Sequence, residues 1–495
     1  MAYAGLDVGT SGCKLLVYGL DGSLIYRSVR RYQESGEKGY RELDPSLVLR
    51  NVKSVLKEAG DQCPVEIEAM AVASLGESVV LLDAFDNPLC KSALTGDSRG
   101  ISQTERLIEK YGRRRIFEIT GLPPNELYGL PKYMWINEHT EAVRHADKVF
   151  FYEDYIGYYL TGERKVSYSS AARSLAFDIT QKRWSDQLLA EAGIKAEMMS
   201  EPCPSGTLIG TIKPSISEEL HLPRNMKVVV GGHDQSCAAY GSGLNSMDVG
   251  ECGMGTCEFS FMMLPGPVMN QKVIDGDFTC IPYILPDTYL TSIEIPTCGI
   301  LKNWARDQLF EGIRQRCEQK GENFFSYMDQ RAAETDTDVL VLPQFGSSGN
   351  PDLSMDARGT ITGLTIHTQP EEIYRAIIEG MAFQSYMAYE ETQDFGVDTH
   401  AFVCTGGGAA STLGLQIRAD VFNREMYTLQ TEESGTLGCM MLAAIGAGAY
   451  QSYDEAITSC VKRKAAYLPD PGRHAAYMEK YERYKKLYHL MHEGV

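Results

Sequence analysis

The chain has 495 residues, which is more than one hydrophobic core usually organises, so two or three domains are expected. Its 47 basic and 66 acidic residues leave a net charge of −19, and such a surface repels phosphate backbones, which predicts no nucleic-acid partner. The sequence has no apolar run long enough to cross a bilayer, no export signal and 13 scattered cysteines, which favours a cytoplasmic protein with reduced thiols and no membrane partner.

Three short strands are predicted at the N-terminus, before any long helix. YAGLDV, CKLLVYGL and SLIYRSV are apolar runs separated by the turn residues GTSG and DG. Asp44 and Pro45 then provide a cap and a first-turn proline for the helix DPSLVLRNVKSVLKEAG. The next predicted strands are VEIEAMAVASLG and VVLLDAFDNPL, and helical patterns alternate with short loops between residues 100 and 200.

The stretch VVVGGHDQSCAAYGSG, residues 228–243, predicts a buried strand, a glycine turn and a helix of small residues. His233 and Asp234 lie at the turn. In one interpretation Asp234 caps the helix, since aspartate is a good N-cap residue. In the other, the end of the strand presents the carboxylate to a ligand.

The second half of the chain repeats the plan of the first. MDVGECGMGTCEFSFMM, near residue 250, again predicts a strand, a Gly-Thr turn and a strand. This echo suggests two similar α/β domains that face one cleft. The segment GSGLNSMD suits a linker, so we place the domains at residues 1–245 and 246–495. The C-terminal tyrosine stripe favours packing over binding, and its members are Tyr477, Tyr481, Tyr484 and Tyr488.

Three glycine turns follow predicted strands, at residues 9–12, 253–256 and 406–409. Turns of this kind can aim consecutive backbone N–H groups at phosphate oxygens, and the hydroxyls of Thr10 and Thr256 add donors. Each turn taken alone favours an ordinary hairpin or strand–helix connection over a phosphate site.

Asp7 lies near the end of the first apolar strand, beside one of these turns. A carboxylate in such a place needs a partner or a cation, and beside a phosphate turn a magnesium role is natural. The dipeptide Gly-Lys never occurs, which excludes a Walker A loop, and GGGAAS lacks the dinucleotide-binding glycine spacing.

Twelve blocks in chain order resemble the FGGY carbohydrate kinases, which include xylulose, gluconate, ribulose and glycerol kinases. They are GLDVGTSGCK, SLGESVVLLD, TGDSR, EDYIGYYLTGE, RWSDQLL, PSGTLIG, VVVGGHDQSCAA, GMGTCE, ARGTITGLT, IYRAIIEGMAF, CTGGGAAS and TLGCMMLAA. The resemblance implies an α/β fold of two actin-like, ribonuclease-H-like domains with a ligand cleft between them. It also implies that ATP, with Mg²⁺, phosphorylates a hydroxyl group of a sugar or polyol.

The family's functional residues carry over position by position. The matches are Asp7, Gly9, Thr10, Ser11 and Lys14 for the first phosphate motif, Gly255 and Thr256 for the second, Gly299 beneath the nucleotide, and Gly406, Gly407 and Gly408 for adenosine. Asp234 matches the catalytic aspartate, which accepts a proton from the sugar hydroxyl, and Gln235 matches its substrate-contacting neighbour. Asp7, through water, and Asp234 are the expected magnesium ligands. For His233 we favour simple packing over tuning of the base.

The sugar-facing residues depart from familiar relatives. Aligned on LLD, xylulose kinases have Met-His and glycerol kinases have Arg-Glu where this chain has Gly76 and Glu77. A carboxylate accepts hydrogen bonds from paired hydroxyls and would repel an acid such as gluconate. Glu77 therefore predicts a neutral substrate.

The other positions expected near the sugar agree with the relatives only in part. Asp97 and Arg99 are kept, Thr95 replaces a tryptophan that many relatives have, and Asp154 matches a position that approaches the sugar. We therefore expect a neutral ketose such as a pentulose, in a reaction like that of xylulose kinase, or a polyol.

One alternative from another functional class is an actin-like ATPase that acts as a chaperone or regulator, because this fold also hosts such proteins. Asp234 and the sugar-facing blocks SLGES and TGDSR favour the kinase, since a chaperone needs neither. A sugar sensor without activity is disfavoured because every phosphate motif is intact. The sequence leaves open the exact sugar, the hydroxyl that is phosphorylated and the oligomeric state, for which a homodimer is one option.

Overall fold

The computed structural model describes residues 2–36, 39–352, 354 and 356–492, and each half of the chain builds one mixed β-sheet. The first sheet has the order β13-β14-β5-β1-β2-β3, with strands β1 (Ala2–Val8), β2 (Gly12–Tyr18), β3 (Leu24–Arg31), β5 (Ile67–Ser74), β13 (Leu208–Thr211) and β14 (Lys227–His233). The second has the order β17-β18-β16-β15-β21-β22-β23, with strands β15 (Val249–Met254), β16 (Glu258–Leu264), β17 (Ile281–Pro282), β18 (Tyr289–Ile295), β21 (Ala401–Thr405), β22 (Glu425–Leu429) and β23 (Arg463–Tyr467).

The two sheets share one pattern of strand pairing. In the first, β1 is antiparallel to β2 and parallel to β5, and β5 is parallel to β14. In the second, β15 is antiparallel to β16 and parallel to β21, and β21 is parallel to β22. The echo near residue 250 is therefore the visible part of a repeated domain topology. The fold class is α/β with two actin-like domains, as expected.

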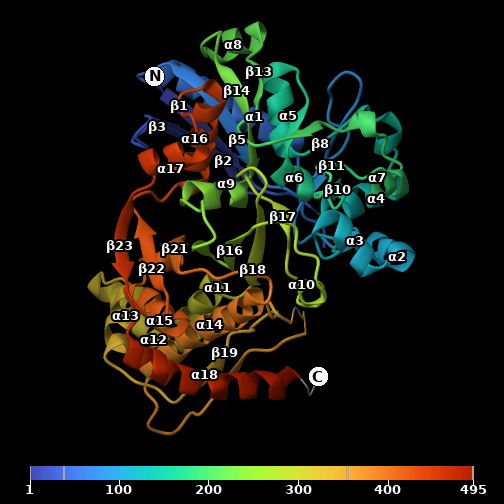
Figure 1. Cartoon of the computed structure of the whole chain (residues 1–495). Helices are drawn as coiled ribbons and strands as arrows, with labels where there is room; N and C mark the ends of the chain where they lie inside the picture. The colour runs from blue at the N-terminus through green and yellow to red at the C-terminus, as the bar shows by residue number, and fades with distance from the viewer. Residues whose placement is uncertain (1, 37–38, 353, 355, 493–495) are drawn as a thin grey trace.

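Helices cover the sheets (Figure 1). Those of the first half are α1 (Pro45–Gln62), α2 (Ile101–Tyr111), α3 (Arg113–Thr120), α4 (Gly129–His139), α5 (Tyr152–Thr161), α6 (Tyr168–Ala172), α7 (Asp186–Ala192), α8 (Pro214–Leu220) and α9 (Asp234–Gly241). Those of the second half are α10 (Gln271–Asp275), α11 (Gly299–Trp304), α12 (Glu311–Lys320), α13 (Phe324–Ala333), α14 (Pro370–Gln393), α15 (Thr412–Phe422), α16 (Ser434–Ala447), α17 (Tyr453–Cys460) and α18 (Pro471–His492).

Short elements join these helices and strands. They are β4 (Glu42–Leu43), β6 (Val80–Leu82), β7 (Ser92–Ala93), β8 (Lys148–Phe150), β9 (Lys165–Ser167), β10 (Phe177–Asp178), β11 (Arg183–Trp184), β12 (Glu201–Cys203), β19 (Leu340–Leu342), β20 (Thr360–Thr362), the 3₁₀ turns η1 (Ala142–His145), η2 (Ala196–Met198) and η4 (Gly407–Ala410), and the π-helical turn η3 (Ala305–Leu309). In the described part of the chain, no helix is both long and apolar enough to span a membrane.

Several local predictions are confirmed. The Asp44 carboxylate accepts a hydrogen bond from Ser46 N, 2.8 Å away, and so caps α1, whose apolar side packs on β2 and β3. The tyrosine stripe of α18 is buried, as packing requires. Every cysteine is free, and all but Cys63, Cys90 and Cys257 are buried.

Helix α16 belongs to the second half of the chain but packs on the sheet of the first half. It contacts β1, β5 and β14, and Figure 1 shows α16 and α17 beside the N-terminal strands. The approach is so close that a Cβ atom on Gly5 would collide with the carbonyl oxygen of Thr436. A boundary at residue 245 therefore separates the two sheets, but not the helices that cover them.

Candidate active site

The parallel strands of the first sheet bring its acidic residues to one edge. β1, β5 and β14 run in the same direction, so their carboxyl ends meet there, which is where open α/β sheets bind ligands. Asp7 lies at the end of β1, Gly76 and Glu77 follow β5, and His233 and Asp234 lie where β14 ends and α9 begins. Residues that are far apart in the sequence thus form one site.

Asp234 is the first residue of α9, whereas the cap position is occupied by His233, which makes no capping hydrogen bond. The structure therefore does not support the capping interpretation. Oδ1 of Asp234 accepts a hydrogen bond from Gln235 N at 2.7 Å, and the side chain remains 34% exposed. Burial of the group, with the charges of Asp7 and Glu77, raises the pKa of Asp234 to about 8.

His233 is packed beside Asp234. It is buried, and its Nε2 lies 3.2 Å from Oδ1 of Asp234. Burial, helped by the charge of Arg173, lowers the pKa of His233 to about 4, so the ring is neutral at pH 7. A neutral imidazole can donate one N–H to the Asp234 carboxylate without adding a charge to the site.

The first phosphate turn is the hairpin between β1 and β2, closed by Gly9 N donating to the Gly12 oxygen at 2.9 Å. Thr10 is half-buried and Ser11 is exposed, so a ligand can reach both. Lys14 lies opposite Asp7 in the hairpin, with its Nζ 3.2 Å from Asp7 and 2.7 Å from Glu433. Burial raises the pKa of Asp7, while Lys14 opposes that shift.

Three of the motifs expected to hold the nucleotide contact one another: Gly255-Thr256, Gly299 and the glycines 406–408. Gly299 N, at the start of α11, donates to the Gly255 oxygen at 3.1 Å, and Ile300 N donates to the Thr256 oxygen at 3.1 Å. A Cβ on Gly406 would lie 2.7 Å from the Met254 oxygen, and one on Gly408 would lie 2.6 Å from Met254 Cβ. Gly407 lies between these two glycines, at the start of η4. Glycine is therefore required for this approach of the backbones.

Glu77 is paired with a residue that the sequence analysis missed. Arg173, just after α6, donates from Nε to Glu77 Oε1 at 2.7 Å and again from Nη2, and both side chains are largely buried. Burial would raise the pKa of Glu77, but Arg173 outweighs it and the pKa falls to about 2. Because the Glu77 charge is neutralised by Arg173, the expected repulsion of acidic substrates by Glu77 loses its basis.

Gly76 makes room for this pair. A Cβ at position 76 would lie 2.6 Å from His233 Cδ2 and 2.8 Å from Arg173 Cγ. Arg173, just after α6, thus brings a guanidinium close to Gly76. The only sequence signal for Arg173 is its place in the block SSAARS.

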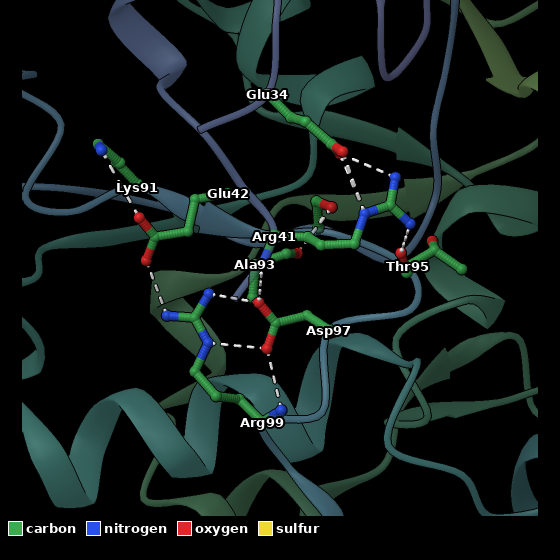
Figure 2. A network of polar contacts seen from close by, with 9 residues as sticks. Glu34, Arg41, Glu42, Lys91, Ala93, Thr95, Asp97 and Arg99 are labelled. Atoms are coloured by element: carbon green, nitrogen blue, oxygen red, sulfur yellow. Dashed lines mark hydrogen bonds and ion pairs between the residues drawn. The ribbon is translucent and has the colours of Figure 1, made fainter. Parts of the chain in front are cut away.

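Asp97 and Arg99 require a correction, because they form a closed network rather than an open subsite (Figure 2). Asp97 accepts from Arg99 Nε, Nη2 and N and from Arg41 N at 2.6–2.9 Å, and it is 1% exposed. These four bonds use all its acceptor positions, so none remains for a sugar hydroxyl. Arg99 also pairs with Glu42 at 2.8 Å.

Asp154 also requires a correction. One carboxylate oxygen accepts from Phe151 N at 2.7 Å, at the start of α5, and the other accepts from Ser200 Oγ at 2.6 Å. The residue is 1% exposed, so it stabilises a helix end and does not contact a sugar. Gln235 is half-buried beside Asp234, where it stays a predicted substrate contact.

A second residue that the sequence analysis missed is Lys132 of α4. It is 1% exposed, and its Nζ has no hydrogen-bond partner among the described residues. Burial lowers the pKa of Lys132 to about 8, against the opposing charges of Glu77 and Asp97. Lys132 is therefore a buried amino group close enough to Glu77 and Asp97 to feel their charges.

Two family models match most of the chain. The model for the N-terminal domain of the FGGY family of carbohydrate kinases matches residues 2–241, and the model for its C-terminal domain matches residues 250–447. The xylulose kinase of Bacillus subtilis is 27% identical, over 98% of this chain and 96% of its own.

Solved structures share the fold. Xylulose kinase from Rhodospirillum rubrum matches with a TM-score of 0.91 at 23% identity, over 100% of this chain and 99% of the other. Glycerol kinase from Plasmodium falciparum, solved with ADP, matches with a TM-score of 0.87 at 19% identity, over 98% and 97%. These comparisons do not favour the chaperone alternative. The chain belongs to the FGGY family of carbohydrate kinases and is an enzyme that phosphorylates a sugar or polyol.

Proposed function

We propose that this kinase transfers the γ-phosphoryl group of ATP to a hydroxyl of a neutral ketose such as a pentulose, or of a polyol, with Asp234 as general base. The observation that carries the proposal is the Asp234 carboxylate. It is partly exposed at the sheet edge, and its raised pKa of about 8 gives it affinity for a proton near neutral pH.

In the proposed reaction, the sugar oxygen attacks the γ-phosphorus in line with the departing ADP oxygen. Asp234 accepts the proton of that hydroxyl as the new O–P bond forms, while neutral His233 lies 3.2 Å from the same carboxylate. Backbone N–H groups of the glycine turns, with the Thr10 and Thr256 hydroxyls, hold the phosphates. Domain closure excludes water, which otherwise competes as the acceptor.

The site fits Mg²⁺. Asp7 and Asp234 lie close enough for the charge of Asp7 to raise the pKa of Asp234, and a divalent cation would relieve that repulsion. Within the described residues, no group of three or more His, Cys, Asp or Glu side chains is arranged to hold a metal. Asp7, through water, and Asp234 would hold Mg²⁺ with the phosphates, where it neutralises their charge. Lys14, which now pairs with Asp7, would then be free to contact phosphate.

Asp234→Asn tests the proposal. The wild-type enzyme is first assayed by ADP release against pentuloses, hexuloses, polyols and aldonates, and the best substrate is then used for both proteins. Asparagine keeps the shape of the side chain but cannot accept the proton, so we expect kcat to fall by roughly 10²–10⁴-fold. The melting temperature should not fall, because asparagine places no negative charge beside Asp7 and Glu77.

A variant that keeps more than about a tenth of the wild-type rate would contradict a general base at Asp234. A wild-type enzyme that prefers gluconate would contradict the neutral substrate. Turnover of ATP that does not depend on any added sugar or polyol would contradict both parts of the proposal.

A further inference from the structure

Glu294 is a carboxylate on β18 of the second sheet that no part of the proposed reaction uses. It lies in β18 between Ile293 and Ile295, which are buried, so the alternation of side chains turns Glu294 to the opposite face. Directly opposite residues share a face, and Glu294 pairs with Phe259, which pairs with Gly253 just before the second phosphate turn.

The backbone of Glu294 is fixed while its side chain is free. Glu294 N donates to Asn350 Oδ1 at 2.8 Å, and Asn350 N donates to the Glu294 oxygen at 3.1 Å. Among the described residues, the carboxylate itself has neither a hydrogen bond nor an ion pair. Burial raises the pKa of Glu294, and the strongest opposing influence is the charge of Arg173 in the other domain.

Arg173 offers a free donor toward Glu294. Its Nε and Nη2 both donate to Glu77 Oε1, and no hydrogen bond of Nη1 to a described residue is found. The Arg173 guanidinium lies 5.1 Å from the ring centre of Tyr128, and the charges of Glu77 and Glu294 both act on that tyrosine. Glu77, Arg173 and Tyr128 of the first domain therefore lie near enough to Glu294 of the second for their charges to influence one another.

We propose that Glu294 is a substrate-binding residue of the second domain, whose carboxylate accepts a hydrogen bond from a sugar hydroxyl that Arg173 Nη1 contacts from the first domain. This inference rests on the proposed function, since it requires a sugar in this cleft. The substrate then bridges the two domains and favours their closure. The charge of Glu294 is not paired within the described residues, so Glu294, rather than Glu77, repels carboxylated sugars.

Glu294→Gln tests the inference, with Glu425→Gln as its matched control. Glu425 is a carboxylate on β22 of the same sheet and pairs with exposed Arg463 at 3.1 Å, away from the cleft. Loss of a hydrogen bond to a charged acceptor should lower kcat/KM for the best sugar by about 10- to 100-fold in Glu294→Gln, mainly through KM. KM for ATP should stay unchanged, and the control should behave like wild type.

Two further measurements separate binding from structure. The ratio of kcat/KM for an aldonate to that for the ketose should rise in Glu294→Gln, because the repelling charge is gone. Small-angle scattering with the sugar and a non-hydrolysable ATP analogue should show a smaller decrease in the radius of gyration than in wild type. The melting temperature should not fall, because the side chain makes no bond to protein.

If Glu294→Gln keeps the wild-type sugar KM and the wild-type substrate ratio while wild type phosphorylates the sugar, this inference is wrong and the proposed function stands. If wild type phosphorylates no sugar or polyol, the proposed function fails first, and the inference fails with it.

Discussion

The pairing of Glu77 with Arg173, which the sequence analysis did not predict, changes the role expected of Glu77. From the sequence, Glu77 is a free carboxylate, whereas in the structure it is half of a largely buried ion pair. Removing one partner of such a pair leaves the other charge buried without compensation, and the cost is large. The pair is therefore as much a structural element of the pocket as a ligand.

Arg173→Met should lower the free energy of unfolding by about 3–5 kcal/mol at pH 7, since Glu77 is left buried and unpaired. The pKa of Glu77 is about 2 in the folded protein against an ordinary 4.5, so the pair stabilises the fold fully above pH 4.5 and loses that effect as the pH falls through about 2. Urea unfolding of variant and wild type at pH 7 and at about pH 4 should show a smaller difference at the lower pH.

The control for Arg173→Met is the double variant Glu77→Gln, Arg173→Met, which leaves no buried charge at this pair and should recover most of the loss. An equal loss of stability at both pH values, or no recovery in the double variant, would show that the guanidinium acts by packing alone.

Sequence and structure agree on the placement of residues that belong to a local pattern. Asp7, Thr10 and Asp234 lie at strand ends next to glycine turns, and such patterns are visible within ten residues. Arg173, Lys132 and Glu294 are not predictable from the sequence, because the groups that lie near them come from other elements or from the other half of the chain. Asp97 and Asp154 were assigned to the sugar because an acidic residue in a family block gives no hint that arginine or backbone N–H groups already use its oxygens.

At the scale of elements, the placement of Asp234 depends on two closely packed helices. A Cβ on Gly241 in α9 would collide with the Ser434 oxygen of α16, and a Cβ on Gly438 in α16 would collide with the Cys237 oxygen of α9. α9 begins at Asp234, so its distance from α16 sets where the carboxylate lies. The strands and the cap of α1 were predictable from periodicity. The contact between α9 and α16 was not, because it joins segments roughly 200 residues apart and its only sequence signs are two glycines.

Gly438→Ala should push α9 away from α16. We expect a loss of stability of about 1–3 kcal/mol, as for other overpacked sites, and a fall in kcat that exceeds any rise in the sugar KM. Thermal unfolding and steady-state kinetics measure the two effects. Gly312→Ala in α12 is the control, because no heavy atom lies within 4 Å of the added Cβ, so it should be neutral or slightly stabilising. Wild-type stability and rate in Gly438→Ala would show that the helices adjust freely.

At the scale of the whole molecule, the first domain is completed by the last quarter of the sequence. Leu437, Met440, Met441 and Ala444 of α16 are buried, and the helix packs on β1, β5 and β14. The repeat of the sheet was visible in the sequence through its glycine turns. The packing of α16 on the first domain was not visible, because the sequence pattern of a helix of small and apolar residues fits either domain equally well.

A fragment of residues 1–245 should therefore not fold alone, although it holds a whole sheet. We expect it to aggregate, or to show no cooperative thermal transition by circular dichroism, since the face of the sheet that α16 covers is left open. Joining residues 433–461 to its C-terminus through a flexible linker should restore a cooperative transition. A fragment 1–245 that unfolds cooperatively at wild-type temperature would contradict this dependence.

Because α16 of the second half packs on the sheet of the first half, the first domain is completed late during synthesis. On the ribosome, the strands of the first sheet are complete once β14 has emerged, but α16 is synthesised roughly 200 residues later. At about 5–20 residues per second, that interval lasts roughly 10–40 s. Throughout it, the nascent chain presents an apolar sheet face with no helix to cover it. We therefore expect the first domain to stay open to aggregation until α16 has been synthesised, and slow translation of the second half to lengthen that period.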